Sequence, residues 1–458
     1  MNQSLEDTII AISTPPGPGG IGIIRLSGPE ALSIATRIFN CRELNPASYP
    51  RTMCFGHLVD FETGESLDAG YLCYFPAQVS YTREEVVEIN LHGSPVLLAE
   101  AVRLGIKAGA RMAHPGEFTF RAYLNGRIDV LQAEAINDLI RASSIDQARI
   151  SFKQLEGSLS RKIAQVREKL VEVLSLLETR IEFPEEETGL NEEIFRQVLE
   201  ELLLVLEKLI RSYDRGRAML EGLTIALLGK TNVGKSTLFN ALLQEDRSIV
   251  TPYPGTTRDF IRENILVDGV LMKLVDMAGF GQAQHPVEEE GILRSQKLAE
   301  NADGLLVVLD SSREESEEDF FLLERFKEKK KIVVFNKSDL EPRINRDKIL
   351  ARIPESPVVE ISALSGHNLE KLRELMLKTF SPSWDKQEEI ILHERQKLLV
   401  ERMSAHLKKA LEMVEAGYGE ELVVEEIRAV LPVIGQLTGE IKVQEVLDEI
   451  FNRFCLGK

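Results

Sequence analysis

The sequence predicts a multidomain protein with an N-terminal α+β domain, an all-α helical domain and an α/β domain inserted into the helical one. Three observations predict this order. Short β-like runs broken by turn residues occupy residues 1–118, and long helical periodicity fills 119–221 and returns over 383–458. Between the helical stretches, residues 222–382 alternate apolar strands with helices, which is typical of a doubly wound parallel sheet.

The composition is acidic, with 55 Lys and Arg against 73 Asp and Glu and a net charge of −18. This balance argues against a protein that wraps nucleic acid by neutralising its phosphates, but it leaves RNA open as a local or partner-assisted substrate. No apolar run approaches the ~18 residues of a membrane span, and the N-terminus has no basic export signal. The four cysteines show no paired spacing. We therefore expect a cytoplasmic protein with free thiols and no membrane association.

The N-terminal domain is expected to contain strands near residues 8–12, 22–26, 71–75 and 86–91. Residues 17–22 formally fit the G-x-G-x-x-G fingerprint of a dinucleotide site. The residues after them favour strand and turn, whereas this fingerprint must open a helix. We therefore reject a dinucleotide site here.

The helical domain is predicted from apolar stripes over residues 128–140, 163–177 and 194–210. Pro184 and Gly189 mark a break between the last two stripes. Helix is expected again from about residue 388 to residue 454.

Residues 229–236 read G-x-x-x-x-G-K-S, after an apolar strand at 223–228 and before an apolar helix at 237–242. The glycines allow backbone N–H groups to surround phosphates at a helix N-terminus. Lys235 supplies a positive charge to the β and γ phosphates, and the Ser236 hydroxyl suits Mg²⁺. The inserted domain is therefore predicted to be a P-loop nucleotide-binding domain.

Three further motifs follow at strand ends, and they favour guanine nucleotides. Asp276 can hold the Mg²⁺ shell, and the amide of Gly279 can sense the γ-phosphate. The carboxylate of Asp339, which closes an Asn-Lys-Ser-Asp stretch, can accept two N–H groups of guanine, whereas adenine offers the wrong pattern. Residues 362–364 provide the second wall of a guanine pocket. This order resembles the GTP-binding fold of translation-factor-class GTPases, so a GTPase (G) domain is expected.

The segment that would contact the γ-phosphate and Mg²⁺ is also recognisable, at residues 250–259, where Thr257 can complete the Mg²⁺ shell. The position after the D-x-x-G motif, often a water-orienting Gln, is Phe280, so the water must be positioned by another group. Glu288 and its two acidic neighbours are candidates, but the residues alone favour a solvated helix start as the interpretation of that trio. The predicted contacts to GTP or GDP are Gly229, Lys230, Asn232, Val233, Gly234, Lys235, Ser236, Thr237, Thr251, Pro252, Tyr253, Pro254, Gly255, Thr256, Thr257, Asp276, Met277, Ala278, Gly279, Asn336, Lys337, Asp339, Ser362, Ala363 and Leu364.

Several separated motifs carry a resemblance to one family. They are residues 14–17 (TPPG), 20–28 (GIGIIRLSG), 87–93, 115–119 (PGEFT), 122–125, 132–136 (QAEAI), 255–259 (GTTRD) and 455–458 (CLGK). With these motifs in this order, the chain resembles the MnmE family of tRNA-modifying GTPases over essentially its whole length.

The resemblance implies a homodimer formed through the N-terminal domain, which would bind 5-formyl- or methylene-tetrahydrofolate. It implies a partner, an MnmG-type FAD protein in a heterotetramer, and a tRNA substrate. Together the two proteins would add an aminomethyl or carboxymethylaminomethyl group to carbon 5 of the wobble uridine. It also implies that the G domains of the dimer meet when GTP, Mg²⁺ and K⁺ are bound, with K⁺ offsetting the charge that develops on the transferred phosphoryl group.

The resemblance also assigns roles to single residues. It makes Glu288 the residue that orients the attacking water, which reverses the preference for a solvated helix start. Met277 departs from the more common Thr, at little expected cost, because the amide of Gly279 does the sensing. Mg²⁺ would be held by Ser236 and Thr257. The K⁺ ligands would be Asn232, Thr251, Tyr253 and Thr256, the folate ligands would be Arg25, Glu88, Arg127 and Lys458, and Cys455 would be a second catalytic residue, close to the folate.

A rival hypothesis is a switch GTPase that assists ribosome assembly and binds RNA without altering it. A basic RNA-binding domain appended to the chain would favour this rival. From Trp384 onward the chain has 10 Lys and Arg against 15 Asp and Glu, which disfavours it. Without the resemblance, Arg25 would be interpreted as a surface charge.

Overall fold

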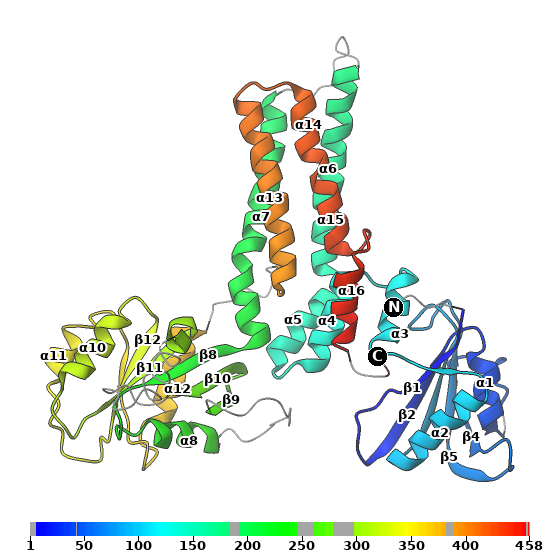
Figure 1. The fold of residues 1–458 in the computed structure, drawn as a ribbon, viewed down its shortest axis with the longest axis horizontal. Helices are drawn as coiled ribbons and strands as arrows, with labels where there is room; N and C mark the ends of the chain where they lie inside the picture. Colours follow the sequence, from blue (N-terminus) through cyan, green and yellow to red (C-terminus); the bar gives the residue numbers. More distant parts are fainter. Residues whose placement is uncertain are drawn as a thin grey trace, which may run out of the picture. The chain divides into compact units, whose positions relative to one another are not determined.

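The computed structural model describes residues 6–42, 44–182, 192–245, 261–277, 297–381, 389–454 and 457. The chain forms two compact units (Figure 1). The first unit comprises Met1–Arg141, Ser151–Glu207 and Leu398–Lys458, and the second comprises Ala142–Ile150 and Lys208–Lys397. Both the N-terminal α+β part and most of the helices therefore belong to the first unit, and the G domain belongs to the second.

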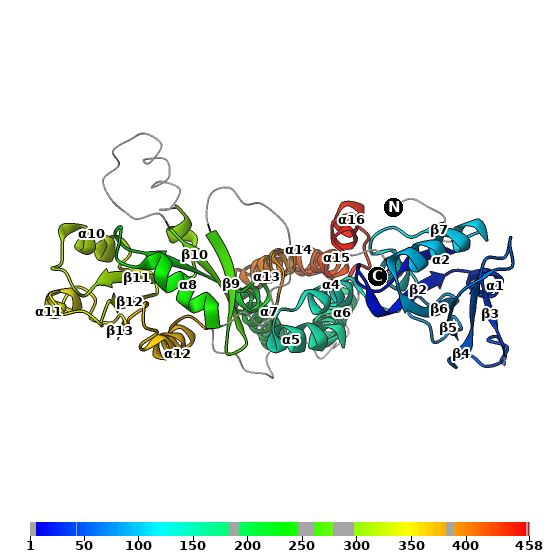
Figure 2. The ribbon, with the colours of Figure 1, turned by 90° about the horizontal axis from the view of Figure 1, so that it is seen from below.

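A seven-stranded sheet of order β3-β4-β5-β6-β2-β1-β7 forms the N-terminal part. All its pairs are antiparallel except β1 with β7. Two helices, α1 (Ala31–Ile38) and α2 (Pro95–Lys107), share a buried apolar cluster with the strands, because the strands alternate buried and exposed side chains and leave one apolar face to cover. Figure 2 shows both helices beside this sheet. The strands are β1 (Ile9–Ile12), β2 (Gly19–Ser27), β3 (Phe39–Cys41), β4 (Cys54–Val59), β5 (Ser66–Phe75), β6 (Val86–Gly93) and β7 (Arg111–Met112).

The four strands predicted in this part are confirmed by β1, β2, β5 and β6. The glycine-rich residues 17–22 run into strand β2 and open no helix, as the rejection of a dinucleotide site requires. The last of these glycines allows a close approach, since a Cβ on Gly22 would lie 2.4 Å from Leu98 Cδ1 of helix α2.

The helices of the first unit bury most of the apolar stripes that the sequence predicts, but Ile140 and Ile194, at the ends of two stripes, are 47% and 44% exposed. In α6 the stripe residues Ile163, Val166, Leu170, Val173 and Leu177 are all buried. The helices of this group, some of which extend into the second unit, are α3 (Glu117–Leu124), α4 (Val130–Arg141), α5 (Ile145–Leu155), α6 (Ser158–Glu182), α7 (Glu192–Glu221), α13 (Glu394–Glu415), α14 (Glu420–Arg428), α15 (Val430–Thr438) and α16 (Gln444–Asn452).

The predicted start of the C-terminal helices near residue 388 was wrong, because α13 begins at Glu394. The backbone N–H groups just before this helix donate to side-chain oxygens and not to the carbonyl groups of a helical turn. The N–H of Leu392 donates to Oε1 of Gln396 at 3.1 Å, and the N–H of Ile391 donates to Oγ of Ser212 at 3.0 Å. The side chain of Gln396 therefore caps the incoming chain at the helix start.

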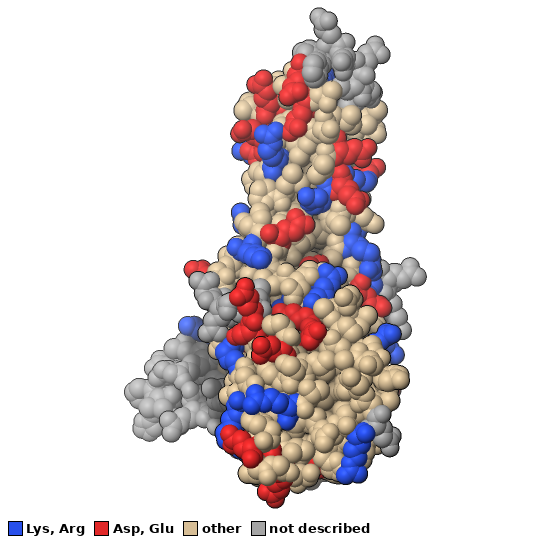
Figure 3. All heavy atoms as spheres, turned by 90° about the vertical axis from the view of Figure 1, so that its right-hand side faces the viewer, with Lys and Arg blue, Asp and Glu red and all other residues tan. Residues whose placement is uncertain are grey.

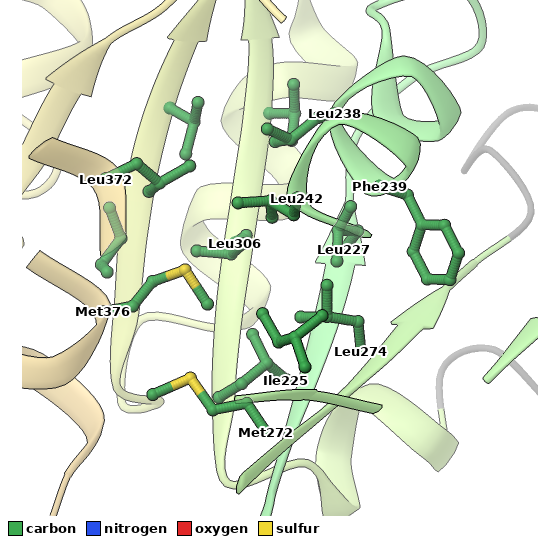
Figure 4. Packing of buried hydrophobic residues seen from close by; sticks show 14 of the residues in the cluster. Ile225, Leu227, Leu238, Phe239, Leu242, Met272, Leu274, Leu306, Leu372 and Met376 are labelled. Atoms are coloured by element: carbon green, nitrogen blue, oxygen red, sulfur yellow. The ribbon is translucent and has the colours of Figure 1, made fainter. Parts of the chain in front are cut away.

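The second unit contains a six-stranded sheet of order β13-β12-β11-β8-β10-β9. Helices α8 and α12 share one apolar cluster with it, and α10 and α11 share another, so the sheet is covered on both faces. Figure 4 shows Leu238 and Leu242 of α8 and Met376 of α12 packed against the strands. The elements are β8 (Leu223–Leu228), α8 (Lys235–Glu245), β9 (Ile261–Val267), β10 (Val270–Asp276), β11 (Gly304–Asp310), α10 (Glu317–Arg325), β12 (Lys331–Asn336), α11 (Arg346–Leu350), β13 (Val358–Glu360) and α12 (Leu369–Phe380).

The predicted fold class is confirmed, with one departure from a fully parallel sheet. Strand β9 runs antiparallel to β10 and forms an edge. The turn between them is Asp268-Gly269, with φ of 44° and 86°, which is the chemistry of a two-residue hairpin.

The first and last segments of the inserted domain are bonded to each other. Ser212 lies near the end of α7 and accepts the N–H of Ile391. A Cβ on Gly216 would lie 2.1 Å from the carbonyl oxygen of Ile391, so only glycine allows this approach. Helix α7 then leads through Gly222, whose φ is 83°, directly into β8. Among the described helices, none has the length and apolarity needed to cross a membrane.

Candidate functional site

The P-loop follows the carboxyl end of β8, which is an interior strand of the second unit's sheet. Its backbone needs special residues at three positions. A Cβ on Gly229 would lie 2.4 Å from the carbonyl of Val308, and one on Gly234 would lie 2.3 Å from Nδ2 of Asn336. Asn232 has a φ of 64°, which short polar residues tolerate. The loop is thus packed against the ends of β11 and β12, and helix α8 starts directly after it, at Lys235.

Lys235 is buried, and its ammonium group faces the P-loop backbone. Its Nζ donates to the carbonyl oxygens of Gly229 at 3.0 Å and Lys230 at 2.7 Å. Burial lowers the pKa of Lys235, while the carboxylate of Asp276 opposes this shift. The group is therefore held inside the loop that would surround the phosphates.

Ser236 and Asp276 come together at the first turn of α8 and the end of β10. Oγ of Ser236 donates to Oδ2 of Asp276 at 2.7 Å. The other oxygen, Oδ1 of Asp276, is buried and accepts no hydrogen bond from any described residue. A buried, unpaired carboxylate oxygen beside a hydroxyl is a donor set that suits Mg²⁺.

The Asn-Lys-Ser-Asp stretch is tied to both neighbouring motifs. Nδ2 of Asn336 donates to the carbonyl of Val233 at 2.9 Å, and Oδ1 of Asn336 accepts the N–H of Ala363 at 2.9 Å. Nζ of Lys337 donates to the carbonyl of Asn232 at 2.9 Å. The P-loop, residues 336–339 and residues 362–364 therefore form one connected site.

Asp310 at the end of β11 also belongs to this site, although no motif identifies it. Its Oδ2 accepts from Nζ of Lys337 at 2.6 Å, and its Oδ1 accepts from Oγ of Ser312 at 2.6 Å. Burial tends to raise the pKa of Asp310, but these bonds outweigh it and the pKa lies below its ordinary value. Asp310 is thus a charged partner that fixes Lys337. Asp339 and Leu364 are exposed.

The structure also brings together three of the four predicted folate ligands. Arg25 of β2 and Glu88 of β6 are directly opposite in the sheet, and their Nη2 and Oε1 atoms lie 2.8 Å apart. The guanidinium carbons of Arg25 and Arg127 lie 5.8 Å and 5.9 Å from the centre of the Tyr81 ring. Tyr81, which the sequence did not identify, therefore connects the two arginines through cation–π contacts.

Tyr81 is itself fixed by further contacts. Its hydroxyl lies 2.9 Å from Oγ1 of Thr119, and burial raises its pKa. The end of the chain also reaches this place, because Nη1 of Arg25 donates to the carbonyl of Gly457 at 3.3 Å and Oγ of Ser13 donates to the same oxygen at 3.1 Å. Gly457 therefore lies beside the Arg25–Glu88 pair.

Part of the predicted sites lies outside the described residues. From the nucleotide site these are Thr251, Pro252, Tyr253, Pro254, Gly255, Thr256, Thr257, Ala278, Gly279 and Glu288, and from the folate site Cys455 and Lys458. Their assignments stay predictions.

Comparison with known proteins decides the family. The model of the MnmE helical domain matches residues 130–455, and that of the GTP-binding protein TrmE N-terminus matches residues 8–127. The chain belongs to the MnmE family of tRNA modification GTPases. The tRNA modification GTPase MnmE of Thermoanaerobacter sp. (strain X514) is 40% identical over 457 residues, 99% of each chain. The MnmE of Aquifex aeolicus (strain VF5) is also 40% identical, over 99% of this chain and 100% of its own.

A solved structure of Era from Aquifex aeolicus, bound to GDP and AlF4⁻, aligns with 40% of this chain and 66% of its own at 27% identity, with a TM-score of 0.30. Because that score is low, the family assignment depends on the two family models and the full-length MnmE relatives. MnmE membership confirms the expected enzyme class, a GTP hydrolase. Both relatives are named as tRNA modification GTPases.

Proposed function

We propose that this MnmE-family chain binds GTP in the second unit with Mg²⁺, hydrolyses it, and uses this cycle in the modification of tRNA wobble uridine. The observation that carries the nucleotide part is the contact of Ser236 with Asp276, beside an unpaired carboxylate oxygen and the P-loop. Ser236 and Thr257 would bind the ion, with Asp276 close to it. When bound, Mg²⁺ supplies positive charge to the β and γ phosphates.

The chain's own groups would then divide the remaining work in the nucleotide site. Lys235 and the backbone N–H groups of residues 229–237 would bind the phosphates, and Asp339 would select guanine. Residues 251–257 and 276–279, together with 362–364, would complete the contacts. We assign K⁺ to Asn232, Thr251, Tyr253 and Thr256 from the family resemblance, and Glu288 to orientation of the attacking water.

The folate proposal is supported by the chemistry of the side chains around Tyr81. Glu88 carries two acceptor oxygens, which suit the adjacent N–H groups of a pterin ring. Arg25 and Arg127 supply positive charge for the glutamate tail, as would Lys458. Because the Arg25–Glu88 pair is already formed, a ligand would have to insert beside it or exchange for it. Cys455 would act near the one-carbon unit.

The proposed homodimer would form through the N-terminal part, where the described surface offers exposed aromatic groups. Phe55 on β4 and Tyr71 on β5 are directly opposite, 42% and 47% exposed, with ring centres 5.5 Å apart. Figure 3 shows that uncharged residues cover most of the lower part of the face it draws. The exposed Phe55 and Tyr71 rings support contact with another protein, because aromatic side chains are enriched in protein interfaces. We also propose an MnmG-type FAD protein as partner, in a heterotetramer, and a cytoplasmic location. The domain limits 1–118, 119–221, 222–382 and 383–458 stay proposals.

Mass spectrometry of wobble nucleosides from cells that lack this protein tests the modification. We expect the carbon-5 substituent to disappear and to return with the wild-type gene. Unchanged wobble nucleosides would overturn the tRNA role while leaving the GTPase intact. GTP turnover in K⁺ and in Na⁺ tests the cation separately, with several-fold faster turnover expected in K⁺ and equal rates counting against that site.

A further inference from the structure

The side chain of Lys230, the second residue of the P-loop motif, leaves the loop and contacts helix α10. Its Nζ lies 2.7 Å from Oδ2 of Asp319 and donates to Oγ of Ser316 at 2.8 Å. Ser316 and Asp319 form a capping box at the helix start, in which the N–H of Ser316 donates to Oδ2 of Asp319 at 3.0 Å. The P-loop is thus joined to the N-terminus of α10 by an ion pair.

This ion pair is not an ordinary surface contact. The side chain of Asp319 is 4% exposed and that of Lys230 is 22% exposed. Oδ1 of Asp319 is buried and accepts no hydrogen bond from any described residue, so its charge is balanced through Oδ2. A buried carboxylate requires a cation nearby, and Lys230 supplies it.

The backbone of Lys230 meets the phosphate-binding lysine. Its carbonyl oxygen accepts the 2.7 Å hydrogen bond from Nζ of Lys235. The second half of the loop is held differently, since Asn232 and Val233 are bonded through their carbonyls to Lys337 and Asn336. The Lys230 side chain therefore holds the first half of the loop through contacts that are separate from those of the second half.

We propose that Lys230 is a positioning residue, whose ion pair with Asp319 keeps the first half of the P-loop in place and so slows the release of bound guanine nucleotide. This rests on the proposed assignment of residues 229–236 as the phosphate site. Loss of the pair frees the loop segment that carries the Lys230 carbonyl, and Lys235 loses a fixed partner.

The test is the release of fluorescently labelled GDP from the full chain, followed by stopped flow. In Lys230→Met we expect release roughly tenfold faster, the size of one charge-assisted hydrogen bond. Asp319→Asn should act in the same direction, and the double variant should be no faster than the faster single one, because both remove the same pair. Lys230→Arg should keep release close to wild type. The KM for GTP should rise by a larger factor than kcat falls.

The matched control is Lys327→Met. Lys327 also pairs with an acid, Glu324, but both side chains are 60% exposed. Glu324 lies in the last turn of α10, and Lys327 follows the end of that helix at Arg325. The proposal would be overturned if the Lys230→Met protein released GDP at the wild-type rate. It would also be overturned if the increase in release rate of the double variant were the product of the two single increases. Should Lys230→Met fail to fold, Ser316→Ala removes one bond to Nζ, and a release rate equal to wild type would then count against it. Lys235→Ala tests the phosphate site itself: retained GDP binding there would refute that assignment, whatever Lys230 does.

Discussion

Replacement of Arg121 by Met should destabilise the first unit, because Arg121 balances buried acidic groups. Arg121 on α3 is 1% exposed, and its guanidinium contacts three carboxylates. Nη2 lies 2.6 Å from Oδ1 of Asp7 and 3.0 Å from Oε1 of Glu117, and Nη1 lies 3.1 Å from Oε2 of Glu84. Met keeps much of the apolar stem but leaves these acids with one cation fewer.

The magnitude follows from the burial of the partners. The side chains of Glu117 and Glu84 are 9% and 15% exposed, so their charges are poorly hydrated. Removal of one member of a buried pair costs about 3–5 kcal/mol. Arg111 still contacts Asp7 and Glu117, which places the expected loss at the lower end, about 3 kcal/mol.

Amide hydrogen exchange of α3, measured by mass spectrometry of its peptides, is the appropriate assay. A loss of about 3 kcal/mol corresponds to exchange roughly 10²-fold faster where unfolding of the unit limits it. The control is Arg103→Met. Arg103 is exposed and pairs with Glu100 on helix α2, so no change in the protection of α3 is expected. Exchange of α3 in Arg121→Met within about threefold of wild type would refute the reasoning.

The pH dependence of stability gives a second readout of the same cluster. Burial raises the pKa of Glu117, but bonds from Arg111, the N–H of His114 and Arg121 outweigh this, and the pKa lies below its ordinary value of 4.5. The unfolded chain then binds more protons in this range, so the stabilisation is present above pH 4.5 and is lost as the pH falls further. In Arg121→Met this acid sensitivity should weaken.

Three further outcomes are expected, one at each proposed binding group. Asp339→Asn should weaken GTP binding more than tenfold. It should also improve binding of XTP, because the carbonyl of the xanthine base can accept a hydrogen bond from the new amide. Unchanged GTP affinity would contradict the guanine assignment. Ser236→Ala should raise the Mg²⁺ concentration for half-maximal GTP turnover roughly tenfold, whereas an unchanged Mg²⁺ titration would exclude Ser236 as a ligand. Glu88→Gln should weaken tetrahydrofolate binding, measured by calorimetry, about tenfold, and equal affinities would remove Glu88 from that site.

Much of the nucleotide site could be predicted because its motifs follow strands. Parallel strands place their carboxyl ends at one edge of a sheet, so the P-loop, Asp276, residues 336–339 and residues 362–364 had to converge there. The antiparallel edge strand β9 also has a sequence signal, since the Asp268-Gly269 pair between two apolar runs is typical of a hairpin.

Other features gave no local signal. Tyr81 lies in a loop, and its role depends on two arginines that are distant in sequence. The partners of Arg121 are likewise spread over residues 7–117, and neither periodicity nor a motif joins them. The start of α13 depends on the side chain of Gln396. The N–H of Leu392 donates to that side chain, so it does not donate to the carbonyl four residues earlier, as a helix starting near residue 388 would require.

The hydrogen bond between Ile391 and Ser212 bears on how the G domain could be inserted during evolution and how it could be removed. The points where the chain enters and leaves the G domain are neighbours, so the whole domain occupies the place of a hairpin loop. Loop length adds little entropy cost once the two ends are fixed together. A host helix pair can therefore accept a domain of this size in one genetic event, and a short glycine-rich bridge can take its place when the domain is cut out.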